Sequence, residues 1–459
     1  MKILILHAER LGDVAVSIPA IEALRRHYPQ ATLHVLTSTM GEKLLQTHPA
    51  IDWVSAVPWK TPTLRELWHL AQRIRTARYD LYICLSTTLW GQALGWAAGI
   101  PRRLGEKAYL VSRWLLTDSV PVRWDNMGHH RFMDSLAILG PLGISHDGSL
   151  PTITVDPTAV SAIRKRLSDL PPDRPLVTIF CDTSGSTLPI PDAILAKTIP
   201  DLIQTFGVNV ALTSDTTRAD SPLHQLKDPH VLDILDFLPL PDLIALLSLS
   251  NYYIGPDTGP THLASLMGIP LVLFAGKKIN PPTKWGPLSP FFVILREDYH
   301  CESFCTRGRC DAEQCVTWLT PRHLVDAFRT LWDQVKAAKP MPWQARLDAH
   351  WLATVRVLYV TTDLDEELRT RSLLKRLWND GLRIFPMSFD LRHPLRSFRT
   401  LLRQAIRHNA TVIHGPVLPF WAMTFLRWYY RFWLHYPPPK IYRGALAPEA
   451  DLASLRLLF

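Results

Sequence analysis

Apolar and polar positions alternate in two distinct ways along the first third of the chain. Short runs rich in β-branched residues, at 2–7, 32–37 and 81–85, predict strands. Between them, apolar residues recur every three to four positions and predict helices around 17–27 and 64–78. In the second helix the apolar positions share one face and are expected to be buried: Leu64, Leu67, Trp68, Ala71 and Ile74. Strands alternating with amphipathic helices indicate a parallel sheet covered on both faces.

The same alternation returns after a proline-rich stretch at 170–175. The strand-like runs of this second series are 176–180, 208–213, 231–235, 252–255 and 271–274. We therefore expect an α/β fold with two Rossmann-like domains joined by a linker near 155–175. The ligand of such an arrangement lies in the cleft that faces the carboxyl ends of both sheets.

A third block follows a helical segment at 321–338 and a break at Lys339-Pro-Met-Pro342. It has strand patterns at 356–361, 383–387 and 411–414 and a helical pattern at 366–379, which together predict a small C-terminal α/β extension. The expected domains are residues 1–160, residues 161–338 and an additional unit at 343–459.

Length and composition agree with this division. A chain of 459 residues exceeds what one core usually supports, and 47% hydrophobic with 20% charged residues is typical of globular domains. The first ten residues lack the features of a signal peptide, and no window offers the roughly twenty uninterrupted apolar residues of a membrane-spanning helix. The sequence therefore predicts a cytoplasmic protein that is soluble or peripheral on a membrane.

A formal net charge of +9 points to a polyanionic partner, or simply to a solvated basic surface. The polyanions considered are nucleic acid, an anionic membrane surface and a phosphorylated glycolipid. No helix-turn-helix, RRM or zinc-finger pattern is found, and the arginines are scattered through helices. We therefore expect no nucleic-acid partner.

The turn after the first strand, Arg10-Leu-Gly-Asp13, carries a candidate catalytic acid. Gly12 permits close approach of the backbone, and Asp13 stands between the carboxyl end of a strand and the start of a helix that includes Ser17. Such an acid would face the cleft. The alternative is that Asp13 only caps the helix through its free N–H groups.

A second candidate site runs from Tyr253 to Ala264 and contains Asp257-Thr-Gly-Pro-Thr-His262. A strand ends, a polar turn follows, and a helix is expected to start at about Pro260. Free amides at a helix start and the positive end of its dipole suit a pyrophosphate. The alternative is an Asx-type turn with proline at the first helical position, which needs no ligand.

Four cysteines lie within fifteen residues, at Cys301, Cys305, Cys310 and Cys315. They lack the Cys-x2-Cys pairs of common structural zinc sites, and a disulfide conflicts with a reducing cytosol. A structural metal and reduced, partly buried thiols both remain open. They are the candidate metal ligands of the sequence.

The segment 421–436 combines aromatic residues with a narrow basic stripe of Arg427, Arg431 and His435. Such a helix suits a membrane interface, where tryptophan and tyrosine are favoured and arginines meet lipid phosphates. Residues 417–440 are therefore a candidate for peripheral membrane contact, and the alternative is that they pack against the third unit. His129 and His130, by contrast, are predicted to form an exposed pair before a helix.

Taken together, the two motifs, about 240 residues apart, resemble glycosyltransferase family 9, the ADP-heptose:lipopolysaccharide heptosyltransferases. That family's Leu-Gly-Asp turn matches Leu11-Gly12-Asp13, and its Asp-Thr/Ser-Gly-x-x-His-Leu-Ala motif matches residues 257–264. Similarity continues through 235–240, 274–276 and the cysteine segment. It covers about residues 1–335 and leaves out about the last 120.

This resemblance implies a GT-B fold in which residues 1–160 form the acceptor domain and residues 161–338 the nucleotide-sugar domain. It implies an inverting, metal-independent transfer of a heptose or related sugar, from an ADP-activated donor to a lipopolysaccharide core or other glycolipid at the inner membrane. No cofactor is expected beyond the donor substrate. Asp13 would be the general base. The residues expected to bind substrates are Gly12, Ser17, Thr183, Ser184, Asp257, Thr258, Gly259, Thr261 and His262.

One segment departs from the family pattern. Family members commonly place a lysine before a Trp-Pro pair at the start of the C-terminal domain, where it neutralises donor phosphates. The corresponding run here, residues 181–191, has neither lysine nor tryptophan, although Thr183, Ser184 and Ser186 supply hydrogen-bond donors. Lys277, Lys278 and Lys284 are candidate replacements for the charge. The alternative function is therefore a catalytically weakened nucleotide-sugar-binding scaffold protein in envelope glycan assembly.

Overall fold

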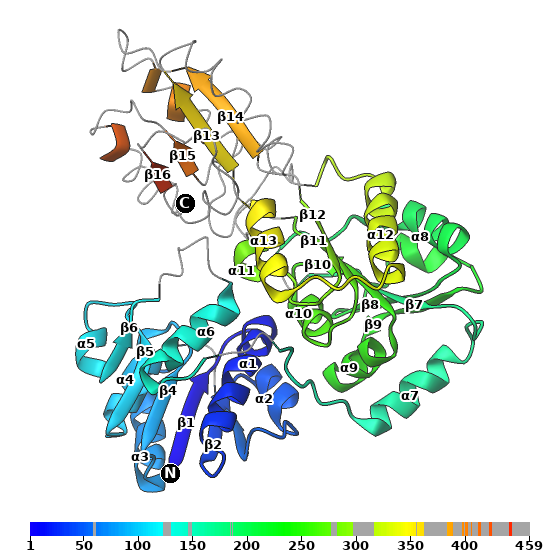
Figure 1. The fold of residues 1–459 in the computed structure, drawn as a ribbon. Coiled ribbons are helices and arrows are strands. Elements are labelled where there is room, and N and C mark those ends of the chain that lie inside the picture. The colour runs from blue at the N-terminus through cyan, green and yellow to red at the C-terminus, as the bar shows by residue number, and fades with distance from the viewer. Residues whose placement is uncertain are drawn as a thin grey trace.

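The structure is a computed structural model in which three parallel sheets follow one another along the chain (Figure 1). It describes residues 1–57, 61–122, 130–145, 149–183, 185, 187–276, 282–296, 316–354 and 356–361, and from there on residues 383–388, 397–398, 400–402, 405, 412–414, 422–424 and 440–442.

The N-terminal sheet has six parallel strands in the order β3-β2-β1-β4-β5-β6. Its strands are β1 (Lys2–His7), β2 (Thr32–Thr37), β3 (Trp53–Ala56), β4 (Leu81–Cys84), β5 (Arg102–Glu106) and β6 (Asp118–Val120). Its helices are α1 (Leu11–His27), α2 (Thr39–Leu45), α3 (Leu64–Ala77), α4 (Leu89–Ala97), α5 (Ser112–Leu115) and α6 (Arg131–Leu139), followed by the 3-10 turn η1 (Gly140–Leu142). The central strand β1 is buried from Ile3 to His7, as expected where both faces of a parallel sheet are covered.

The second sheet repeats this plan in the order β12-β11-β10-β7-β8-β9, again with parallel neighbours. Its strands are β7 (Leu176–Phe180), β8 (Asn209–Ser214), β9 (Val231–Phe237), β10 (Tyr252–Pro256), β11 (Leu271–Phe274) and β12 (Phe292–Leu295). Its helices are α7 (Pro157–Leu167), α8 (Asp192–Phe206), α9 (Leu240–Leu249), α10 (Gly259–Leu266), α11 (Pro282–Trp285) and α12 (Pro321–Lys336), with the 3-10 turn η2 (Pro222–Gln225). The expected α/β class with two Rossmann-like units is confirmed.

A third, four-stranded parallel sheet has the order β14-β13-β15-β16. Its elements are α13 (Trp343–Thr354), β13 (Arg356–Thr361), β14 (Arg383–Ser388), β15 (Val412–His414) and β16 (Lys440–Tyr442). This is the small C-terminal α/β extension. Helix α13 links it to both other sheets, because the Trp343 ring packs edge-on against Phe132 of α6 and the His350 ring lies beside Phe292 of β12.

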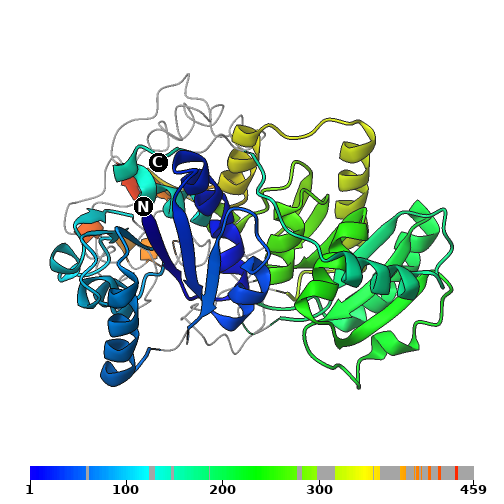
Figure 2. The ribbon, with the colours of Figure 1, turned by 90° about the horizontal axis from the view of Figure 1, so that it is seen from below.

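Figure 2 shows the blue N-terminal and green C-terminal domains side by side, with α1 on the side of its domain that faces the green one. This position explains why α1 is buried almost all round from Val14 to Leu24, rather than along one stripe. Among the helices that the structure describes, none combines the length and the apolarity needed to cross a bilayer.

The expected buried stripe of α3 is wrong in its first turns. Ala71 and Ile74 are buried, but Leu64 is 86% and Trp68 54% exposed. The helix starts with a capping box between Thr63 and Glu66, so its N-terminus is stabilised locally. Apolar spacing set the face that these residues occupy, but Leu67 packs only in part against the core, while Leu64 and Trp68 remain exposed.

Candidate active site

A cleft of about 690 Å³ opens between the first two sheets, on the side of their carboxyl ends. Residues from both domains line it. The N-terminal wall consists of Glu9, Arg10, Leu11, Gly12, Asp13, Ser38 and Met40. The C-terminal wall consists of Asp215, Phe237, Leu238, Leu240, Leu243, Asp257, Thr258, Gly259, Pro260, His262 and Trp285.

The starts of helices α1 and α10 meet in this cleft. A Cβ added to Gly12 would lie 2.7 Å from Cδ2 of His262, and one added to Gly259 would lie 3.1 Å from Cδ2 of Leu11. The approach of the two domains therefore leaves no room for a Cβ at Gly12 unless His262 moves, and little room for one at Gly259. Because a helix N-terminus carries free amides and a partial positive charge, the cleft receives two such ends.

Asp13 lies in the first turn of α1 and lines the cleft. The N-cap residue is Arg10, which makes no side-chain cap hydrogen bond, so Asp13 does not occupy the capping position. Burial raises the pKa of Asp13, whereas Arg131, His262 and Arg10 lower it. A partly desolvated carboxylate with a raised pKa is a stronger base than an exposed one.

Glu9 stands beside Asp13 on the same wall. Burial, and then the charge of Asp13, raise the pKa of Glu9, while Arg131 lowers it. Its carboxylate also interacts with Ser86 and with the backbone of Thr87, after β4. Arg131, from the start of α6, is thus the nearby cation that favours the ionised forms of both acids.

Helix α10 begins without a protein cap. Its N-cap residue, Thr258, makes no side-chain cap hydrogen bond, and its first turn contains no acidic residue. The Asp257 carboxylate lies 3.4 Å from Nε2 of His262, and both side chains are buried. The polar turn is thus tied to the helix, and the amides at the helix start are suited to an anion.

Behind the cleft, a buried ion pair joins the two domains. Nζ of Lys284 lies 2.6 Å from Oδ2 of Asp134 in α6, and Arg131 lies 3.7 Å from the same oxygen. Nε2 of His130 is 2.9 Å from the carbonyl oxygen of Gly286. Burial lowers the pKa of Lys284, and the Asp134 carboxylate opposes this shift. Lys284 is committed to Asp134 and does not line the cleft.

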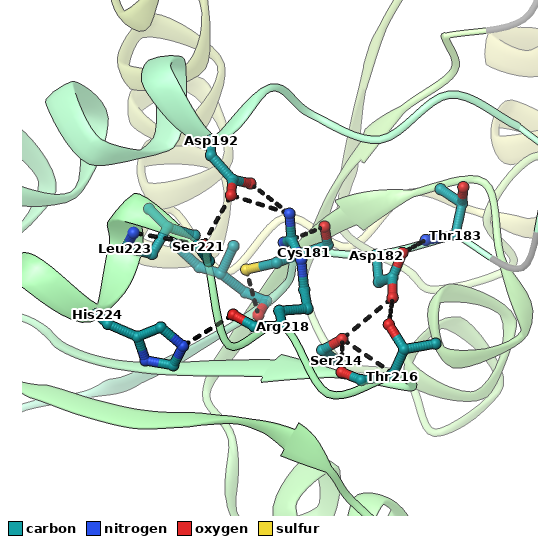
Figure 3. A network of polar contacts seen from close by, with 11 residues as sticks. Cys181, Asp182, Thr183, Asp192, Ser214, Thr216, Arg218, Ser221, Leu223 and His224 are labelled. Atoms are coloured by element: carbon teal, nitrogen blue, oxygen red, sulfur yellow. Dashed lines mark hydrogen bonds and ion pairs between the residues drawn. The ribbon is translucent and has the colours of Figure 1, made fainter.

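The segment after β7, where the sequence lacks the expected lysine, forms a polar network with two aspartates (Figure 3). Asp182 accepts hydrogen bonds from Thr183 N at 2.7 Å, from the Ser214 hydroxyl at 3.2 Å and from the Thr216 hydroxyl. Arg218 donates to both oxygens of Asp192 at 2.9 Å, and to the carbonyl oxygen of Cys181 at 2.8 Å. The arginine of this network is therefore already neutralised.

Asp215, which lines the cleft, forms a close pair with Asp182. Burial, and then the neighbouring Asp182, raise the pKa of Asp215 to about 6. Burial opposes ionisation of Asp182 as well, but hydrogen bonds from Thr216 and Thr183 bring its pKa below the usual value. One member of the pair is therefore partly protonated near neutral pH.

Apolar side chains form the remaining wall, at the end of β9 and the start of α9. Phe237 lies there with 58% of its surface exposed, next to Leu238 and Leu240. The ring of Trp285, which also lines the cleft, lies 5.8 Å from that of His262. An exposed aromatic ring in an apolar wall can stack on a nucleobase.

The structure brings six of the sequence-derived site residues together along the cleft: Gly12, Asp13, Asp257, Thr258, Gly259 and His262. Three others are engaged inside the domains. The Ser17 hydroxyl donates to Val14 O and contacts His7, Thr183 donates to Thr187 O, and Thr261 donates to Pro256 O. Outside the described residues lie Ser184, Ser186, Lys277, Lys278, the four cysteines Cys301, Cys305, Cys310 and Cys315, and most of 417–440.

His130 corrects an expectation of exposure, since it is only 2% exposed. Its Nδ1 accepts from the backbone N–H of Phe132 at the start of α6. Burial between α6, Gly286 and the ring of His350 lowers its pKa well below the usual range. A polar residue before a helix suggested the surface, but here the second domain covers it.

Four cleft residues were not anticipated, Glu9, Asp215, Phe237 and Trp285, nor was Arg131, which acts on Asp13 electrostatically. Asp215 and Phe237 end or follow strands, so the rule that ligands bind at the carboxyl ends of parallel strands would have found them. Arg131 carries no local signal, because α6 is brought to Asp13 only by tertiary packing. Across the described residues, no group of three or more His, Cys, Asp or Glu side chains is arranged to hold a metal ion.

Comparison with known proteins identifies the family of this chain. The sequence model of glycosyltransferase family 9 (heptosyltransferase) matches residues 67–315. Lipopolysaccharide heptosyltransferase 3 of Escherichia coli is 24% identical over 279 residues, which cover 58% of this chain and 80% of that protein.

Solved structures share the fold. The glycosyltransferase family 9 protein of Veillonella parvula superposes with a TM-score of 0.60 at 18% identity, covering 72% of this chain and 97% of that one. ADP-heptose lipopolysaccharide heptosyltransferase II of Escherichia coli gives a TM-score of 0.58 at 20% identity, covering 73% of this chain and all of the other. The first two domains therefore have the GT-B arrangement, and the expected family resemblance is confirmed.

Proposed function

The chain belongs to glycosyltransferase family 9, and on that premise we propose that it transfers a heptose or related sugar from an ADP-activated donor to a lipopolysaccharide core or other glycolipid acceptor. The observation that carries this proposal is the position of Asp13. Its carboxylate lies in the cleft directly across from the uncapped start of α10. A base on one wall and an anion site on the other are the two requirements of sugar transfer from a nucleotide donor.

In the proposed reaction, Asp13 removes the proton of the acceptor hydroxyl while the hydroxyl oxygen attacks the anomeric carbon of the donor sugar. The bond between that carbon and the diphosphate oxygen breaks, the diphosphate leaves with the electron pair, and the configuration inverts. Amides at the start of α10, with Thr258 and His262, would stabilise the negative charge on the leaving diphosphate. Phe237 would contact the base.

The division of labour is part of the same proposal. Residues 1–160 would bind the acceptor and residues 161–338 the donor, with 343–459 as an added unit. The acceptor would be anchored in the inner face of the cytoplasmic membrane, and residues 417–440 remain a proposed membrane contact.

The test is release of ADP from ADP-heptose with a truncated lipopolysaccharide acceptor. Asp13→Asn should lower kcat at least about a hundredfold, because a positioned base typically contributes that much, while donor affinity is retained. Glu9→Gln is the matched control, since Glu9 is a second carboxylate on the same wall, and it should lose less than about tenfold. Equal turnover by Asp13→Asn and the wild type would remove Asp13 from the role of base.

A second candidate is a nucleotide-sugar-binding scaffold with weakened catalysis. The observation in its favour is the pair Asp182 and Asp215, which occupies the region where family members place a phosphate-binding lysine. A wild-type protein that binds the donor but releases no ADP with any acceptor would establish this candidate instead.

A further inference from the structure

The N-terminal domain exposes several large apolar side chains at the connection between β5 and α5 and at the start of α4. We name this region the β5–α5 surface and define it as Leu89, Tyr109, Leu110, Val111 and Trp114, together with Lys107 and Arg113. Leu110 is 91% exposed, Trp114 60% and Leu89 43%. Side chains of this size are usually covered when several stand together on a soluble domain.

The backbone beneath this surface is held firmly. The Ser112 hydroxyl donates to Oε1 of Gln92 at 2.7 Å, and Nε2 of Gln92 donates to the carbonyl oxygen of Glu106 at 2.8 Å. Tyr109 N donates to the Ser112 hydroxyl at 3.0 Å, and the Tyr109 hydroxyl donates to Thr87 O at 2.8 Å. Polar groups therefore point inward while the apolar side chains point to solvent.

The charged residues of the β5–α5 surface are both basic. Residues 107–117 contain Lys107 and Arg113 and no acidic residue. The flanking acids are engaged, because Glu106 is buried and Asp118 pairs with Arg102 at 3.3 Å. The guanidinium of Arg113 lies 4.3 Å from the centre of the Trp114 ring. Tryptophan, tyrosine and arginine in one patch match the interface of an anionic bilayer, where rings sit among headgroups and cations meet phosphates.

The β5–α5 surface also adjoins the N-terminal wall of the cleft, which is the proposed acceptor wall. Strands β1, β4 and β5 are neighbours, and Asp13, Thr87 and Lys107 all follow the carboxyl ends of these strands. Glu9, beside Asp13, interacts with Thr87, whose carbonyl group accepts the Tyr109 hydrogen bond. In Figure 1, α5 and β6 lie at the outer edge of the N-terminal domain, away from the C-terminal domain.

We propose that the β5–α5 surface inserts into the interface of an anionic membrane and holds the acceptor wall of the cleft against it. Leu110 and Trp114 enter the headgroup region, and Arg113 and Lys107 contact lipid phosphates. The role of this docking in catalysis rests on the proposed function: it would bring a membrane-anchored acceptor to Asp13. The surface differs from the segment 417–440, and the docking itself needs neither donor nor acceptor.

The test is sedimentation of the full-length protein with vesicles of phosphatidylcholine, alone or mixed with phosphatidylglycerol, without substrates. The double variant Leu110→Asp with Trp114→Ser should bind the mixed vesicles at least about tenfold more weakly, because it removes two inserted apolar groups. Arg113→Gln should weaken binding about fivefold on the mixed vesicles and leave binding to pure phosphatidylcholine unchanged. Trp53→Ser is the matched control, since Trp53 is 66% exposed on β3 at the opposite end of the sheet, and it should bind as the wild type does.

Thermal unfolding of each variant shows whether it has folded. If the double variant is destabilised, Leu110→Ser alone replaces it, because that side chain is almost fully exposed. The proposal is overturned if the wild type does not bind mixed vesicles, or if the variants bind as well as the wild type. It is also overturned if the wild type is a dimer and the double variant is a monomer, because the surface would then join two copies of the chain.

Turnover separates this proposal from the proposed function. On an acceptor embedded in vesicles, ADP release by the double variant should fall in proportion to its vesicle binding. On a water-soluble truncated acceptor, it should equal that of the wild type. A wild type that binds vesicles but releases no ADP would contradict the enzymatic function and leave the docking surface intact.

Discussion

The two walls of the cleft differ in chemistry although each is built at the carboxyl end of a six-stranded parallel sheet. The N-terminal wall presents Glu9 and Asp13, both with raised pKa values, beside the cations Arg10 and Arg131. The C-terminal wall presents an uncapped helix start and the apolar side chains of Phe237, Leu238, Leu240 and Leu243. One wall is suited to move a proton and the other to hold a nucleotide and its phosphates.

This difference shows how two domains of the same fold can supply different parts of one active site. The same topology offers each domain a helix start at the cleft, and a few side chains decide its use. Asp13 places a carboxylate within the first turn of α1, whereas the first turn of α10 has no acid and leaves its amides to an anion. If the C-terminal wall, here called the donor wall, holds the donor as proposed, substitutions in the two walls should have different effects.

The largest effect is expected from breaking the ion pair that holds the walls together. Lys284→Met leaves Asp134 buried with only Arg131 at 3.7 Å, so the free energy of unfolding should fall by about 3–5 kcal/mol. Urea denaturation measures this change. Arg322→Met is the control, because the Arg322–Asp326 pair is exposed and should contribute almost nothing. An equal response of the two variants would show that the buried pair contributes no more to stability than the exposed one.

An intermediate effect is expected at the apolar end of the donor wall. Phe237→Ala removes an exposed ring that we expect to stack on the base, so KM for the donor should rise about tenfold with kcat little changed. Steady-state ADP release with varied donor measures both constants. Leu64→Ala serves as control, because Leu64 is a large exposed side chain outside the cleft. A fall in kcat at constant KM would place Phe237 in the chemical step instead.

The smallest effect concerns the carboxylate pair of the donor wall. Since the pKa of Asp215 is raised to about 6, its charge is lost as the pH falls through that value, and repulsion of the donor diphosphate decreases. Donor affinity should therefore rise about threefold on acidification, and Asp215→Asn should show the tighter binding at every pH. Calorimetric titration with ADP at several pH values measures this. Asp220→Asn, an exposed aspartate outside the cleft, should keep the wild-type pH dependence.

Sequence patterns anticipated much of the fold because they report local physics. Runs rich in β-branched residues located β1, β2, β7 and β11 to within a residue or two, because a parallel strand that is covered on both faces is an almost continuous apolar run. The order of strands and helices was enough to predict parallel sheets. Helix α13, by contrast, has little amphipathic pattern, because its side chains meet two different domains.

The candidate site was anticipated only in part. Asp13 and the turn from Asp257 to Gly259 follow strands and precede helices, so the sequence alone placed them at the cleft. Gly12 was expected to let a ligand approach, but in the structure a Cβ at this position would meet His262 of α10. Ser17 and Thr261 were expected to bind substrate through their hydroxyl groups, but these hydroxyls form hydrogen bonds inside the domains.

The sequence by itself determined the two-domain α/β plan, the family and the two facing motifs, because period, turn chemistry and motif order are properties of neighbouring residues. Tertiary structure alone decided which charges are available. Lys284 is neutralised by Asp134 and Arg218 by Asp192, and Arg131 lies near Asp13. In each case the partner belongs to another element of the fold. Tertiary structure also decided that Trp68 and Leu110 stay exposed while His130 is buried. Coulomb interactions and burial depend on distances in space, which local sequence does not contain.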